Sequence, residues 1–138
     1  MQALTKAVSD PMNASDGCNS GFMRPDSILV ATLITDEEDD PSDENGGSEG
    51  DPASWKQIVV DAKGGESGVV MLGLVGETTV CNGFNGNDGG EDSPRLQSFV
   101  TSFDRHVLGS VCEPNYAPFF EQAVDLITET CTDFVPPE

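Results

Sequence analysis

Two apolar runs dominate the hydrophobic pattern of the chain, at residues 28–34 and 69–75. Neither run alternates polar with apolar positions, and continuous apolar runs of this length are typical of strands buried on both faces of a parallel sheet. A weaker run at residues 107–112 predicts a third strand. The first run is the most apolar, as is typical of a central strand, although no strand precedes it.

Apolar residues at helical spacing lie between and after these strands. Asp51 precedes a proline, which is a typical helix start, and Gly64 ends that pattern. Ser93 opens a second helix in the same way, and a third opens near Asn115. Residues 1–8 indicate the tail of a further helix. The stripe of the last helix is expected to be core and consists of Tyr116, Phe119, Phe120, Ala123, Val124, Ile127, Cys131 and Phe134.

The alternation of strands and helices predicts βαβ units with right-handed crossovers. We therefore expect an α/β fold, with a Rossmann-like three-layer α/β/α arrangement, about three parallel strands and three to four helices. Residues 1–138 would form a single partial domain. Because an exposed apolar edge strand is a liability, we expect an N-terminal half outside this chain to cover the first strand. This chain alone would self-associate through that unpaired strand.

Charge narrows the set of partners. The chain carries 25 acidic and 6 basic residues, a formal net charge of -19. Such a surface repels phosphate backbones and anionic membranes, so we expect no nucleic acid partner. Divalent cations and basic protein surfaces remain as partners. The alternative is that the acidic charge only keeps the protein soluble. No stretch approaches the roughly 20 apolar residues of a transmembrane segment.

Four scattered cysteines indicate disulfide bonds in an oxidising compartment, with buried thiols as the alternative. They form no Cys-x-x-Cys pair, and a single histidine cannot complete an ordinary zinc site. Cys81 and Cys112 follow the second and third strands and share the C-terminal edge of the sheet. Cys18 and Cys131 belong to the opposite edge. We predict the pairs Cys81–Cys112 and Cys18–Cys131, because a disulfide needs Cα atoms within about 7 Å.

Two loops follow the C-terminal ends of the strands, where open α/β sheets bind ligands. One is the acidic loop at residues 36–51, and the other is the Gly- and Asn-rich loop at residues 76–92. Asp36 comes directly after the first strand, and its carboxylate is the kind of oxygen ligand that hard divalent cations prefer. The alternatives are a capping carboxylate for Asp36 and a solvated insertion without a site for the acidic loop.

No enzyme motif is present in the sequence. It has no Gly-x-Ser-x-Gly elbow, no phosphate-binding Gly-x-x-x-x-Gly-Lys and no Gly-x-Gly-x-x-Gly that opens a helix. His106 stands alone before the third strand, where a surface or edge role is expected. We therefore expect a protein that is not an enzyme.

The order and spacing of several segments resemble the C-terminal half of a von Willebrand factor type A domain, of the kind found in bacterial envelope lipoproteins. The segments cover nearly the whole chain and are NSGFMRPD at 19–26, ITDEED at 34–39, RLQSFV at 95–100, SVC at 110–112 with Tyr116, and CTDFVPP at 131–137. The resemblance implies an extracytoplasmic protein, secreted or in the bacterial cell envelope. Because no signal peptide is visible, the export signal is expected upstream of this chain.

The resemblance further implies a metal-ion-dependent adhesion site, with Mg²⁺ or Ca²⁺, that binds a protein or cell-envelope ligand. Asp36 matches the family's aspartate after the fourth strand. The family's Asp-x-Ser-x-Ser motif and its threonine ligand have no match here, since Cys18 stands where a serine is needed in the nearest segment. Glu37 stands where many members have glycine. On this basis the chain alone would bind the ion poorly. The alternative is a metal-free structural or interaction fragment stabilised by disulfides.

Overall fold

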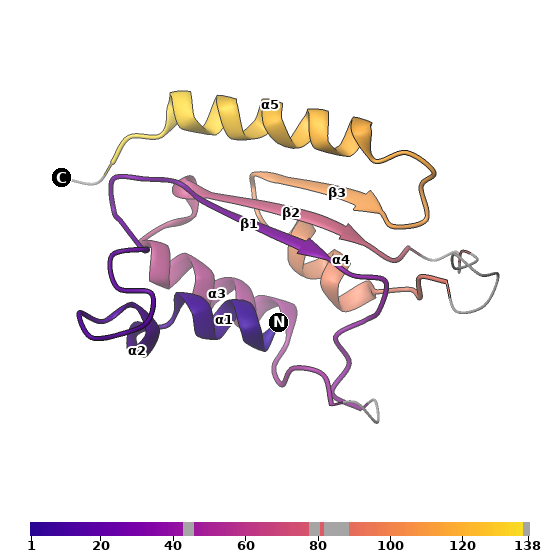
Figure 1. Cartoon of the computed structure of the whole chain (residues 1–138), viewed down its shortest axis with the longest axis horizontal. Helices are drawn as coiled ribbons and strands as arrows, with labels where there is room; N and C mark the ends of the chain where they lie inside the picture. Colours follow the sequence, from indigo (N-terminus) through magenta and orange to yellow (C-terminus); the bar gives the residue numbers. More distant parts are fainter. Residues whose placement is uncertain (43–45, 78–80, 82–88, 137–138) are drawn as a thin grey trace.

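A three-stranded parallel sheet forms the centre of the molecule in the computed structural model, which describes residues 1–42, 46–77, 81 and 89–136. The strands are β1 (Leu29–Ile34), β2 (Val69–Val75) and β3 (His106–Ser110), in the order β1-β2-β3. Leu29 pairs with Val69, and Met71 pairs with His106. The predicted α/β class and the three parallel strands are therefore confirmed (Figure 1).

Helices cover both faces of the sheet (Figure 1). One face carries α1 (Gln2–Val8), α3 (Pro52–Lys63) and α4 (Pro94–Thr101), with the short α2 (Asp10–Asn13) beside α1. The other face carries α5 (Ala117–Asp133) alone. The short α2 and a 3-10 turn, η1 (Glu66–Gly68), were not predicted.

Each face has its own core. The larger core lies between the sheet and α1, α3 and α4, where Trp55, Phe99 and Phe103 pack edge to face. The smaller core lies under α5, where Phe119 and Ala123 contact side chains of β2 and β3. Two buried layers on opposite sides of β2 explain why that strand is buried along its whole length.

Local signals fixed the ends of α3 as the sequence predicts. The Asp51 carboxylate accepts a hydrogen bond from the backbone of Ser54, and the Ser54 side chain accepts one from the backbone of Asp51. This reciprocal pair satisfies two donors of the first turn. Gly64 ends the helix at a φ of 78°, a left-handed conformation that glycine adopts without strain.

The first strand differs from its prediction. The apolar run indicated burial on both faces, but β1 buries only Leu29 and Ala31, towards α1 and α3, and exposes Val30 and Ile34 on the α5 side. The reason is topological, since β1 is an edge strand and α5 lies over β2 and β3.

The aromatic stripe of the last helix is only partly core, so that prediction was too broad. Phe119 and Ala123 are buried, whereas Phe120 and Val124 are 47% and 61% exposed. Cys131 is exposed as well. Because α5 packs on β2 and β3, it buries only a narrow stripe, and the rest of its apolar face stays exposed.

None of the described helices has both the length and the apolar character needed to cross a membrane.

Candidate functional site

Asp36 lies just past the end of β1, held by backbone contacts on both sides. The amide of Thr35 donates to the carbonyl of Leu74 at 3.1 Å and extends the β1–β2 ladder by one residue. The carbonyl of Asp36 accepts from the amide of Glu91 at 2.8 Å. Its carboxylate is exposed, and no described residue bonds to it. The backbone of Asp36 is therefore held at the predicted position, and its carboxylate is free.

The next acidic residue, Glu38, has a structural role. One carboxylate oxygen accepts from the amide of Arg95 at 2.6 Å, in the first turn of α4. The other oxygen accepts from the amide of Asp39 at 2.7 Å. A carboxylate at a helix N-terminus is favoured by the unpaired amides and the helix dipole there. Glu91 binds the loop from the other side, since its carboxylate accepts from the Glu38 amide at 2.5 Å.

Asp39 is also engaged by the protein. Its carboxylate accepts from the amino group of Met1 and from the amide of Ser48. Burial alone would raise the pKa of Asp39, but these hydrogen bonds and the charge of the amino group lower the pKa below its ordinary value. Asp39 thereby joins the start of α1 to the returning arm of the acidic loop.

Arg95 is the anchor of the acidic loop. Its guanidinium donates to the carbonyls of Asp39, Ser48 and Gly50, the last at 2.6 Å. The same group lies 4.6 Å from the centre of the Trp55 ring, a cation–π contact with the core side of α3. No sequence pattern predicts this role of Arg95. The one available signal was an arginine in the first turn of a helix, in a chain with only 6 basic residues.

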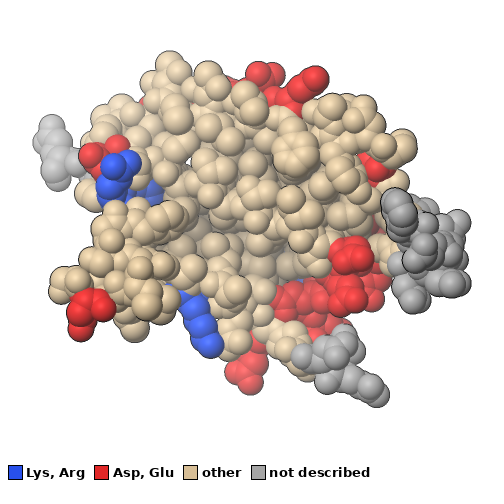
Figure 2. All heavy atoms as spheres, viewed as in Figure 1, with Lys and Arg blue, Asp and Glu red and all other residues tan. Residues whose placement is uncertain are grey.

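Two open pockets of about 460 Å³ each flank this loop. One lies at the end of β1 and includes Thr32, Ile34 and Glu37 in its lining. The other lies against α4 and is lined by Glu38, Asp40, Glu91, Asp92, Pro94 and Arg95. The acidic loop therefore presents carboxylates to two hollows at the C-terminal edge of the sheet, and Figure 2 shows this concentration of acidic side chains.

The described residues do not complete a metal site. Within the described part of the chain, no three Asp, Glu, His or Cys side chains are grouped closely enough to hold an ion. Glu38 and Asp39 instead accept hydrogen bonds from backbone amides. Asp36 and the neighbouring Glu37 are exposed carboxylates without a side-chain bond, and within the described residues they belong to no group of three ligands. Residues 43–45 of the acidic loop lie outside the described residues.

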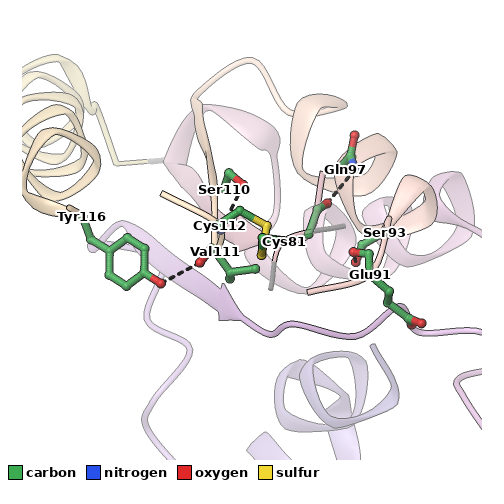
Figure 3. The surroundings of a disulfide bond; sticks show 9 residues. Cys81, Glu91, Ser93, Gln97, Ser110, Val111, Cys112 and Tyr116 are labelled. Carbon is green, nitrogen blue, oxygen red and sulfur yellow. Dashed lines mark hydrogen bonds between the residues drawn. A yellow bond between two sulfur atoms is a disulfide. The ribbon is translucent and has the colours of Figure 1, made fainter. Parts of the chain in front are cut away.

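The second loop, at 76–92, contacts the acidic loop through Glu91. Its residues 78–80 and 82–88 lie outside the described residues. The predicted disulfide Cys81–Cys112 is confirmed, with Cα atoms 5.4 Å apart (Figure 3). It joins this loop to the end of β3. Gly90 lies against both sulfur atoms, where a Cβ would come within 3.5 and 3.7 Å of them.

The second predicted disulfide is wrong, because Cys18 and Cys131 are free and exposed. Cys18 follows α2 on one face of the sheet, whereas Cys131 lies in α5 on the other (Figure 1). Sharing an edge of the sheet is not enough when the sheet itself lies between the two cysteines. His106 lies exposed at the start of β3, and one nitrogen of its ring is 2.6 Å from the Phe103 carbonyl.

Comparisons with known proteins found no matching family model, no similar curated protein and no similar solved structure.

Proposed function

We propose that this chain is the C-terminal part of an exported, non-enzymatic binding module of the von Willebrand factor type A kind. It recognises a protein or cell-envelope ligand through Mg²⁺ or Ca²⁺. The observation that carries the proposal is Asp36, a free carboxylate held by backbone hydrogen bonds at the C-terminal edge of a parallel sheet. That edge is where open α/β sheets bind ligands, and a rigid strand end positions a ligand well.

The remaining ligands of the ion come from outside the described residues. A polypeptide strand that pairs parallel to β1 along its free edge would end beside Asp36 and bring its following loop to the same place. Oxygen ligands from that loop would complete the coordination that one carboxylate cannot provide.

The test is a Mg²⁺ and Ca²⁺ titration by calorimetry on the polypeptide encoded with its upstream sequence. Asp36→Ala is expected to weaken ion binding at least tenfold, because it removes a direct charged ligand. Asp16→Ala is the matched control, since Asp16 is an exposed carboxylate in the turn after α2. Unchanged binding in Asp36→Ala contradicts the proposal, and so does an upstream sequence without an Asp-x-Ser-x-Ser segment.

A second candidate is a metal-free interaction fragment stabilised by its disulfide. The engagement of Glu38 and Asp39 with backbone amides favours it, because a loop built to bind ions would keep such carboxylates free. If this second candidate is correct, the same titration should detect no specific ion binding, either in the wild type or in Asp36→Ala.

An oxidising, extracytoplasmic location is part of the proposal. The Cys81–Cys112 disulfide supports it, since structural disulfides persist outside the reducing cytosol. Self-association of this chain through the free edge of β1 is also part of the proposal, and the alternation of buried and exposed residues along that strand supports it.

A further inference from the structure

The open side of β1 is an uncharged surface in an otherwise acidic protein. Val30 and Ile34 are 38% and 61% exposed on the face that α5 leaves uncovered. Figure 2 shows the uncharged area in the middle of the molecule, between the layers of Figure 1. Apolar strand edges of this kind are pairing surfaces, because both the backbone and the side chains lack partners.

The backbone of β1 shows which groups are open. The Thr35 amide donates to Leu74 of β2, and hydrogen-bonding direction alternates along a parallel strand. The N–H and C=O groups of Val30, Thr32 and Ile34 therefore point away from β2. No described strand pairs with that edge.

These three residues are self-complementary about Thr32. In an antiparallel pair of two β1 strands centred on Thr32, each outward backbone group meets one from the other copy. Val30 of one copy then lies opposite Ile34 of the other, and Thr32 lies opposite its own equivalent. Such β-branched cross-strand pairs stabilise antiparallel sheets. Registers shifted by one residue set an inward-facing backbone against an outward-facing one and lose these bonds.

Charge at the two ends of β1 favours the same antiparallel arrangement. The pocket at the N-terminal end of the strand is lined by Arg24 and Lys63 among apolar residues, whereas the pocket at the other end is lined by Glu37, Glu38, Asp39 and Asp40. Figure 2 shows basic side chains at one end of the uncharged surface and acidic ones at the other. A twofold axis through Thr32 places the basic end of each copy against the acidic end of its partner.

We propose that this chain forms a twofold-symmetric dimer by antiparallel pairing of β1 with β1 of a second copy, in the register centred on Thr32. The result is a continuous six-stranded sheet. The net charge of -19 on each copy opposes association, but at physiological salt charges beyond about 8 Å are largely screened, which leaves the end-to-end contacts. The inference rests on the self-association proposed above and not on the metal site.

The first test is the dimer mass of the intact chain, measured by sedimentation equilibrium. The chain is expected to dimerise, and Thr32→Pro is expected to weaken the dimer at least tenfold, because it removes an outward amide and none of the bonds to β2. Thr32→Val is the matched control, since it keeps that amide. A wild-type chain that stays monomeric overturns the proposal, and so does a Thr32→Pro chain that dimerises as tightly as Thr32→Val.

The second test reads the register and does not depend on the folding of the proline variant. In a background with Cys18 and Cys131 replaced by serine, Thr32→Cys is expected to form an intermolecular disulfide on mild oxidation. Its Cα atoms would lie about 5.5 Å apart across the axis, within disulfide range. Val30→Cys is the control, because its equivalents would be separated by four residues along the strand, roughly 14 Å. Equal cross-linking of the two variants contradicts the proposed register.

A strand from another polypeptide would compete for the same edge. If that strand is the true occupant, the intact chain stays monomeric, and the proposed dimer is wrong while the metal proposal stands. Conversely, a dimer together with unchanged ion binding in Asp36→Ala removes the metal proposal alone.

Discussion

Arg95 determines the shape of the acidic loop more than any of its carboxylates. Its planar fork reaches the carbonyls of Asp39, Ser48 and Gly50 while the same plane covers Trp55. Arg95 thus contacts the loop and α3 at the same time, beside the bonds that Glu38 makes to α4 and that the Trp55 indole makes to the Glu49 carbonyl. A lysine has one point of charge and cannot bond to three carbonyls in this geometry.

We expect Arg95→Lys to lower the free energy of unfolding by about 1.5–3 kcal/mol, the usual contribution of hydrogen bonds to a charged group. Urea denaturation monitored by Trp55 fluorescence measures this change. Arg105→Lys is the control, because Arg105 makes one exposed bond, to the Ser67 carbonyl at 3.2 Å, and should cost less than about 0.5 kcal/mol. Equal decreases in the free energy of unfolding of the two variants would contradict the anchoring role of Arg95.

Glu66 links three elements and makes stability depend on pH. Burial by itself would raise the pKa of Glu66, but the Lys56 ammonium at 2.8 Å and the Asp104 amide lower it below its ordinary value of 4.5. A carboxyl whose pKa is lowered by folding contributes stability above its unfolded pKa and loses it as the pH falls through the folded pKa.

The free energy of unfolding should therefore decrease as the pH falls below about 4.5, and Glu66→Gln should show a smaller decrease than the wild type. Urea denaturation over a series of acidic buffers measures both curves. Parallel curves for the two proteins would show that Glu66 contributes nothing to the acid sensitivity. Glu121→Gln, on the exposed side of α5, is the control and should follow the wild type.

At this scale the sequence predicts residues whose role follows from position along the chain. Asp36 at a strand end and the Cys81–Cys112 pair at one sheet edge are such cases, since topology alone brings them to their places. The roles of Arg95 and Glu38 could not be predicted, because each depends on a contact between α4 and the aperiodic acidic loop, more than 40 residues apart along the chain.

Among the elements, β2 and β3 are connected by the disulfide, which joins the loop after β2 to the turn after β3. Cys81 and Cys112 are separated by 31 residues, a segment that includes α4 and β3. Closing a segment of that length restricts the unfolded chain, and the chain-entropy model gives a stabilisation of about 3–4 kcal/mol.

Reduction of the disulfide should lower the free energy of unfolding by about that amount, as measured by urea denaturation with and without dithiothreitol. The double substitution Cys18→Ser and Cys131→Ser should change neither curve, because both cysteines are free and exposed. A loss on reduction that disappears in the double variant would place the effect on these thiols, against the pairing in the structure.

The helix boundaries were predictable where caps are local, as at Asp51 and Gly64 of α3. The burial of β1 and α5 was not, because an apolar run or stripe reports the potential for burial and not the presence of a neighbour. Val30, Ile34, Phe120 and Val124 all belong to predicted core patterns, and all are exposed.

At the scale of the whole molecule, the alternation of strands and helices was enough to predict the three layers and the parallel sheet. The same alternation placed both loops at one edge of the sheet. It could not show that β1 exposes one side, since that depends on the position of α5 over β2 and β3. The central claim of our account is that this open side is an interaction surface with Thr32 at its centre.

Site-resolved amide hydrogen exchange at low and high protein concentration tests this claim most directly. We predict that the amides of Val30, Thr32 and Ile34 exchange quickly in the dilute protein and gain protection as the concentration rises. The Thr35 amide is the internal reference, because it already donates to Leu74 within each copy. Protection of Val30, Thr32 and Ile34 that does not change with concentration would contradict the account.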